Sequence, residues 1–186
     1  MESSLRAVIL VSAVTVLLSV SLVYGIRYEF TPKTTPQTSS TQTAFGVNEQ
    51  LGLKLTLTLE KTEYSLGEPI NITLTITNVS NQTTTIGLSA YNDFDFQVYN
   101  GTHSVIYQYS DRWIGVAVPQ IVIDETLEAG ESLSENLVWN QTYPIPTGGS
   151  EGVPVSAGTY YIVGLIGSVL SRTNSTIETT PIQITI

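Results

Sequence analysis

Apolar and polar residues alternate along four stretches of this chain, and that alternation constrains its fold more than any other feature. The stretches are residues 51–59, 70–77, 94–98 and 182–186. A period of two places successive side chains on opposite faces of a β-strand, so each stretch predicts a strand with one buried and one solvated face. Threonine, a strong strand former, fills most of the polar positions within the first two stretches. No amphipathic helical pattern follows residue 30, so the chain from residue 51 is predicted to be all-β.

Turn signals separate the predicted strands at intervals that are typical of a β-sandwich. They lie at residues 65–69, 78–82, 100–101, 128–131 and 156–158. About eight or nine short strands at this spacing predict an antiparallel β-sandwich that occupies residues 51–186 as one domain. Residues 78–82 and 100–101 are predicted to be hairpin turns. Residues 143–154, with three prolines and three glycines, are predicted to form a long surface loop.

The N-terminal region, residues 1–30, contains a predicted membrane segment. Residues 7–26 form an uncharged run of 20 residues bounded by Arg6 and Arg27. A helix of this length spans about 30 Å, the thickness of the hydrocarbon core. Two interpretations remain open, because the run could be a retained signal anchor or a cleaved signal peptide with small residues before its cleavage site. We favour the anchor because the apolar run is longer than that of a usual signal peptide.

A spacer is predicted between this helix and the sandwich. Ten of the 13 residues at 31–43 are Thr, Ser or Pro, and the region 31–50 offers little that could be buried in a core. Such a composition predicts an extended, solvated linker or an O-glycosylated stalk. In either form it would hold the sandwich away from the membrane.

Six Asn-X-Ser/Thr triplets suggest on which side of the membrane the sandwich lies. The chain has nine asparagines, and with about a quarter of all residues being Ser or Thr, chance would give about two such triplets. The excess indicates a chain that meets a glycosylation machinery, which predicts a domain outside the cytoplasm. It would be single-pass with the C-terminal domain outside, or secreted if the helix is cleaved. The candidate glycosylation sites are Asn71, Asn78, Asn81, Asn100, Asn140 and Asn174.

Composition excludes several classes of function. The chain has no cysteine and a single histidine, His103, which rules out disulfides, thiol nucleophiles, cysteine-based metal sites and histidine pairs. A net charge of −9 argues against binding to nucleic acid. Asp93 and Asp95 could form a catalytic carboxylate pair, but a solvated strand face explains them as well. We therefore predict no enzyme, no catalytic residue and no cofactor.

The acidic residues between 124 and 131 are the densest group of candidate metal ligands. Their oxygen atoms could bind Ca²⁺, but no EF-hand spacing is present, and we favour a solvated turn. No metal site is predicted. The four residues are Asp124, Glu125, Glu128 and Glu131.

One short segment has the composition of a protein-binding surface. Tyr107, Tyr109, Arg112 and Trp113 lie within seven residues, and Tyr, Trp and Arg are the residue types that dominate binding hot spots. These four residues are the candidate partner-binding site. The alternative is that Trp113 closes one end of the sandwich while Arg112 forms an ordinary ion pair. Trp139 continues a strand alternation and is predicted to lie in the core.

The order of several motifs resembles the BsuPI family of intracellular proteinase inhibitors. The resemblance covers roughly residues 68–167, and the segment 111–117 and the loop 143–154 depart from the family pattern. It implies an immunoglobulin-like β-sandwich and inhibition of a serine protease. The motifs that carry it are ITLTITN at 72–78, DFDFQVY at 93–99, VIYQYS at 105–110, LEAGES at 127–132, LVW at 137–139 and AGTY at 157–160.

Three functions follow from these observations. The first is a membrane-tethered, extracytoplasmic, immunoglobulin-like module with a non-catalytic role in protein binding or in the cell envelope. The second is a serine protease inhibitor of the BsuPI type, which would insert an extended loop, either 111–118 or 143–154, into an active-site cleft. The third is a structural subunit of an envelope layer or filament. The expected partners are thus the membrane and an unidentified protein. In the second function that protein is a serine protease.

Overall fold

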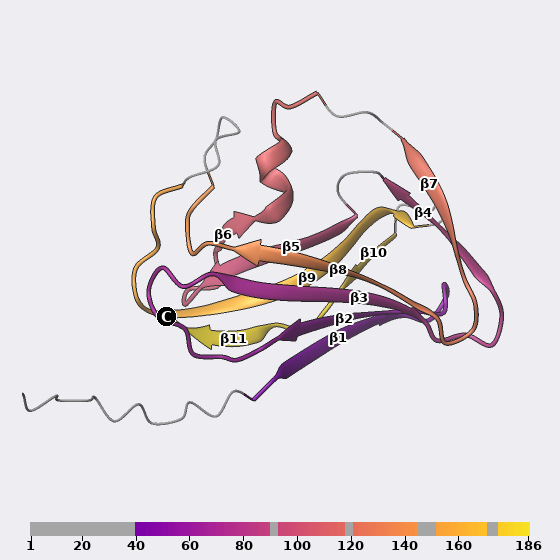
Figure 1. Ribbon diagram of the computed structural model, residues 1–186, viewed down its shortest axis with the longest axis horizontal. Helices are drawn as coiled ribbons and strands as arrows, with labels where there is room; N and C mark the ends of the chain where they lie inside the picture. Colours follow the sequence, from indigo (N-terminus) through magenta and orange to yellow (C-terminus); the bar gives the residue numbers. More distant parts are fainter. Residues whose placement is uncertain (1–39, 90–92, 118–120, 145–151, 171–174) are drawn as a thin grey trace, which may run out of the picture. The chain divides into compact units, whose positions relative to one another are not determined.

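The computed structural model describes residues 40–89, 93–117, 121–144, 152–170 and 175–186 (Figure 1), without the side chains of 168–170. Within these ranges the chain forms eleven strands and one short 3₁₀ helix. The elements are β1 (Gln42–Asn48), β2 (Leu53–Leu59), β3 (Ile70–Asn78), β4 (Thr84–Ser89), β5 (Phe94–Asn100), β6 (Val105–Gln108), η1 (Tyr109–Trp113), β7 (Val122–Leu127), β8 (Ser132–Trp139), β9 (Thr159–Leu170), β10 (Ser175–Glu178) and β11 (Ile182–Thr185).

Two antiparallel sheets account for most of these strands. One sheet has the order β1-β2-β3-β8, and the other has the order β10-β9-β5-β6 with β11 also paired to β9. The remaining two strands, β4 and β7, form a separate antiparallel ribbon. The prediction of an all-β chain with antiparallel sheets is confirmed (Figure 1).

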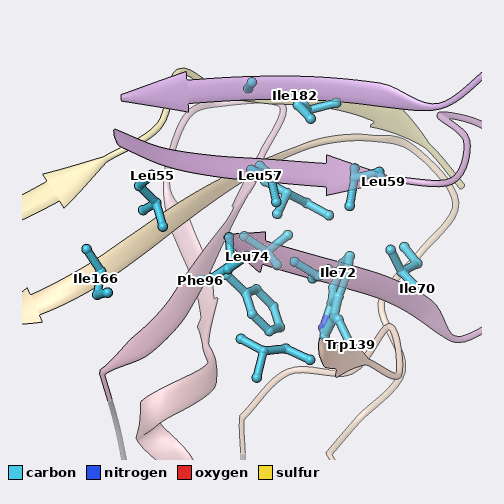
Figure 2. Close-up of a cluster of buried hydrophobic side chains, with 14 of the residues drawn as sticks. Leu55, Leu57, Leu59, Ile70, Ile72, Leu74, Phe96, Trp139, Ile166 and Ile182 are labelled. Atoms are coloured by element: carbon cyan, nitrogen blue, oxygen red, sulfur yellow. The ribbon is translucent and has the colours of Figure 1, made fainter. Parts of the chain in front are cut away.

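The alternating residues of β2 and β3 form the centre of the core. Each strand buries every second side chain and turns its threonines outward, as the sequence pattern predicts. Phe96 from β5 and Ile166 from β9 reach the same core from the second sheet (Figure 2). Trp139 is fully buried at the end of β8, as predicted. Burial of each such large side chain contributes roughly 1.5–3 kcal/mol, so the packing of the two sheets is the main source of stability.

The β4–β7 ribbon continues the β3–β8 pair beyond a kink centred on Asn78. The Asn78 side chain is fully buried, and its Nδ2 donates to the carbonyls of Gln82 at 2.7 Å and Leu127 at 2.9 Å. Its Oδ1 accepts from the backbone N–H and the hydroxyl of Ser80. Asn78 thus links the segment between β3 and β4 to the end of β7 at the kink. Residues 78–82 were predicted to be a hairpin turn, but β3 and β4 pair with β8 and β7 instead.

Strand β1 lies inside the region that was predicted to be a linker. Residues 42–48 pair with β2 along their whole length, although Ala44 is the one core residue among them. With one buried position, the alternation of apolar and polar residues over 42–48 is too weak to predict a strand. Gly46 has a strict steric role here, because a Cβ atom would lie 1.8 Å from the carbonyl oxygen of Glu178. This close approach joins β1 to β10, so the folded unit begins before residue 51.

The predicted membrane helix over 7–26 and the first part of the predicted linker lie outside the described residues. No helix within the described ranges is long and apolar enough to cross a bilayer.

A buried glutamine fixes the loop that precedes β3. Gln141, which has a φ of 56°, donates from Nε2 to the carbonyls of Ser65 and Glu68. Its Oε1 accepts from the N–H of Gly67 at 2.7 Å. One side chain therefore satisfies three backbone groups of a turn more than 70 residues away. Nothing in the sequence pattern around Gln141 predicts this role.

Replacement of Asn78 by alanine should be far more costly than replacement of its neighbour. Asn78→Ala removes four hydrogen bonds, among them the buried one to the carbonyl of Leu127, so we expect a loss of about 2–4 kcal/mol in the free energy of unfolding. Asn81→Ala, at an exposed position of the same turn, is the matched control and should change stability by less than about 0.5 kcal/mol. Urea denaturation measures both, and equal midpoints would show that Asn78 does not hold the kink.

Candidate functional site

The four predicted partner-binding residues come together at one end of the second sheet. Tyr107 lies in β6, and Tyr109, Arg112 and Trp113 lie in η1, which follows directly. The rings of Tyr107 and Tyr109 pack on Phe96 with centroids 5.6 and 5.3 Å apart. The Arg112 guanidinium lies 3.5 Å above the Tyr109 ring and 4.9 Å from the Trp113 ring. We call these four residues the aromatic cluster.

The aromatic cluster is partly accessible to solvent. Tyr107, Tyr109 and Trp113 are half-buried, and Arg112 is exposed. Trp113 is not part of the core, in contrast to Trp139. The alternative in which Trp113 closes the end of the sandwich stays a prediction. Arg112 has aromatic neighbours at cation–π distance, an arrangement worth about 0.5–1 kcal/mol at an exposed site.

Asp95 fixes η1 and thereby the aromatic cluster. Its Oδ1 accepts from the backbone N–H groups of Phe96 and Ser110 at 2.8 and 3.0 Å. Its Oδ2 accepts from Gln108 Nε2 and from the Ser110 hydroxyl, both at 2.7 Å. Hydrogen bonds to a charged acceptor are roughly twice as strong as neutral ones. Asp95 was expected on a solvated strand face, but the start of η1 covers it and it is buried.

Burial shapes the electrostatics of the site. It raises the pKa of the Tyr107 and Tyr109 hydroxyl groups, and the nearby Arg112 guanidinium offsets part of that rise. Loss of hydration, followed by the negative charge of Asp95, raises the pKa of Asp111. Arg112 is thus a lone positive group among acidic side chains at this end of the sheet within the described residues.

The chain beyond η1 is exposed and turned rather than extended. Ile114 donates its N–H to the carbonyl of Asp111, and Val116 donates to that of Trp113, both at 3.0 Å. Gly115 between them has a φ of 79°, which favours glycine. Ile114 and Val116 are 58% and 44% exposed. The described part of the loop 111–118 therefore lacks the extended form expected of an inhibitory loop. In the other candidate loop, 143–154, residues 145–151 lie outside the described ranges.

The remaining acidic residues serve different purposes. In the acidic turn, Glu128 Oε2 accepts from the Thr83 hydroxyl, and Glu131 Oε2 accepts from the Glu128 N–H, which ties the ends of the kink together. The described residues contain no group of His, Asp and Glu side chains placed to hold a metal ion. Asp93 is buried, and its Oδ2 has no hydrogen-bond donor among the described residues. Desolvation raises the pKa of Asp93 to about 6.

The candidate glycosylation sites differ sharply in accessibility. Asn71, Asn81 and Asn140 are exposed, and Asn100 is half-buried with its Oδ1 accepting from Thr102 and Ser104. Asn174 lies outside the described residues. Asn78 does not fit the prediction, because its buried Nδ2 already donates two hydrogen bonds and a glycan there would break the kink. The sequence motif alone cannot show this, since it carries no information about burial.

Asp93 should make the fold less stable as the pH rises. Its pKa is raised in the folded state, so the stabilising contribution of the protonated form is complete below about pH 4 and is lost as the pH passes through about 6. We expect Asp93→Asn to be more stable than the parent by about 2–3 kcal/mol at pH 7.5, and the gain to vanish near pH 3.5. Urea titrations across this range measure it, with the exposed Asp124→Asn as the control. A gain that does not change with pH would contradict the assignment.

Comparison with known proteins places this fold in a family. The model of the BsuPI family, described as intracellular proteinase inhibitor, matches residues 57–169, more than half of the chain. No curated protein matches the chain.

Similar solved structures include a β-glucosidase from Erythrobacter marinus, at 11% identity and a TM-score of 0.37, over 78% of this chain and 15% of that one. A β-glucosidase from Listeria innocua gives 14% identity and a TM-score of 0.35, over 79% and 16%. The chain spans about a sixth of the length of these enzymes, and similarity at this level carries no argument about activity. The family match runs from within β2 to within β9 and includes the aromatic cluster with Asp95, and the chain thus belongs to the BsuPI family of proteinase inhibitors.

Proposed function

We propose that this protein is a non-catalytic, protein-binding module that engages its partner through the aromatic cluster. The observation that carries the proposal is the position of Arg112, which is exposed, stacked 3.5 Å above Tyr109 and held in place by the bonds of Asp95 to η1. A binding surface that is already ordered in the free protein loses less conformational entropy on association. Ile114 and Val116 extend the same surface with exposed apolar area.

An immunoglobulin-like topology supports a role in display and binding. The order β2-β3-β8 against β6-β5-β9-β11 corresponds to strands A-B-E against C′-C-F-G of that fold. The Tyr160 hydroxyl near the start of β9 donates to the carbonyl of Ser156 at 2.6 Å, which matches the tyrosine corner of such domains. We infer that the chain is an immunoglobulin-like sandwich with a ribbon, β4–β7, added between its strands.

We further propose that the sandwich is displayed outside the cytoplasm. The uncharged run at 7–26 supports a membrane anchor, and the Thr/Ser/Pro-rich segment that follows supports a spacer. The exposed triplets at Asn71, Asn81 and Asn140 support a location where glycans are attached. The first strand of the folded domain is then β1, which begins at Gln42.

Cross-linking tests the binding surface directly. A photo-activated phenylalanine analogue at position 114 of the full chain, in its native membrane, should give one discrete cross-linked species. Arg112→Ala should reduce that species at least tenfold, whereas Lys54→Ala, on the outer face of β2, should leave it unchanged. A cross-linker at Thr56 should give none. Equal cross-linking from both positions, or none from position 114, would contradict the proposal.

Membership of the BsuPI family favours a second candidate function, the inhibition of a serine protease. Titration of subtilisin-type and chymotrypsin-type proteases with the full chain in detergent micelles measures it through residual activity. Inhibition that Arg112→Ala weakens at least tenfold, with Lys54→Ala as the control, would make the aromatic cluster an inhibitory surface. If the proteases stay active and the chain stays uncleaved, the family relationship concerns the fold and the partner is not one of these enzymes.

A further inference from the structure

The β4–β7 ribbon ends in a strand with an open edge. β7 pairs with β4 along Val122–Leu127, and no described residue pairs with its other edge. Every residue of β7 except Leu127 is exposed. An unpaired edge presents a row of backbone donors and acceptors that can accept a further strand, and a ribbon of two strands gains stability from a third.

The packing of the ribbon is incomplete on its core-facing side. Strand register places Ile123 opposite Leu88 and Glu125 opposite Ile86, so these four side chains share one face. On β4 this face is covered, because Ile86 is fully buried and Leu88 is half-buried. On β7 the same face is open, and Ile123 is 48% exposed. Val122, on the other face, is 56% exposed. A strand beside β7 would cover these apolar side chains.

The charges of β7 indicate the chemistry of its partner strand. Asp124 and Glu125 are both exposed, lie on opposite faces of the strand, and form no ion pair in the described structure, in a chain of net charge −9. Opposite charges on neighbouring strands stabilise a sheet, and like charges destabilise it. A strand antiparallel to β7 would therefore place two consecutive basic residues beside Glu125 and Asp124, followed by two apolar residues beside Ile123 and Val122.

We infer that β7 is a docking strand for an extended segment of another protein, of the order basic-basic-apolar-apolar, which adds to the ribbon as its third strand. This site is separate from the aromatic cluster and does not require it. Main-chain hydrogen bonds along the edge supply affinity, and the four side chains of β7 supply specificity. A second copy of the chain does not fit, because antiparallel pairing of the whole strand with itself would place Asp124 opposite Glu125 twice.

Hydrogen–deuterium exchange of the full chain in lipid nanodiscs tests this inference. The probe is the hexapeptide serine-arginine-lysine-valine-valine-threonine with blocked ends. At millimolar peptide we expect exchange at 121–127 to slow at least tenfold. The same peptide with N-methyl groups on alternate residues keeps its side chains but cannot form a strand ladder, and it should give no protection.

Charge variants separate specific docking from general attraction. The double variant Asp124→Lys, Glu125→Lys should raise the half-saturating concentration of the basic peptide at least tenfold. The same variant should be protected from exchange by an acidic peptide, which has Glu and Asp in place of Arg and Lys. Glu49→Lys with Glu60→Lys makes the same change in net charge at exposed positions outside the ribbon and should have little effect.

Three results would overturn the inference: no protection by the basic peptide, equal protection by the N-methylated peptide, or an equal loss in both double variants. Protection that rises with protein concentration in the absence of peptide would assign the edge to a second copy instead. Loss of cross-linking at position 114 would leave these results unaffected, so the two surfaces can fail independently.

Discussion

The face-to-face packing of β2 and β3 against β5 and β9 is the constraint on which the rest of the structure depends. The chain has no cysteine and so no covalent link between its sheets. Stability must then come from the interlocked leucine, isoleucine and aromatic side chains between them (Figure 2). Since each strand of the core buries alternate residues, a shift by one residue would expose the whole core face. The burial of alternate residues therefore fixes the strand register independently of any functional site.

Three buried polar side chains then hold the irregular segments against the two sheets. Asn78 closes the kink between the sandwich and the β4–β7 ribbon, Asp95 holds η1, and Gln141 holds the turn before β3. Each is buried and makes at least three hydrogen bonds. A loop that is already held in place loses little conformational entropy when it binds a partner. The hydrogen bonds that hold η1 therefore support the binding role that we propose for the aromatic cluster.

The outer surfaces of the domain differ in how polar they are. Three threonines of β3 are hydrogen-bonded across to β8 through pairs such as Thr75 with Ser134, which leaves most of that face polar. The exposed apolar side chains that we assign to binding instead gather after η1 and along β7. Together with the acidic residues of β7, this arrangement supports our proposal of two chemically distinct binding surfaces on one domain.

Some parts of the structure could be predicted from the sequence because they depend on local pattern. Strands β2, β3 and β11 follow from strict alternation, the hairpin between β5 and β6 follows from Asn100 and Gly101, and burial of Trp139 follows from its place in β8. The proximity of Tyr107, Tyr109, Arg112 and Trp113 was also accessible, since a short helical turn after a strand brings them together. Strand β1 was missed because its single core residue gives almost no periodic signal.

The sequence by itself determined the fold class, the family and the residue types of the proposed binding surface, because period-two burial and short motifs are properties of neighbouring residues. Only the tertiary structure decided that Asp95 is a buried anchor rather than a solvated carboxylate, that Asn78 is enclosed, and that the edge of β7 is open. Each of these depends on which distant segment packs against a residue. Hydrogen bonds such as those from Ser110 to Asp95, and the pairing of β4 with β7, join residues that no local pattern relates.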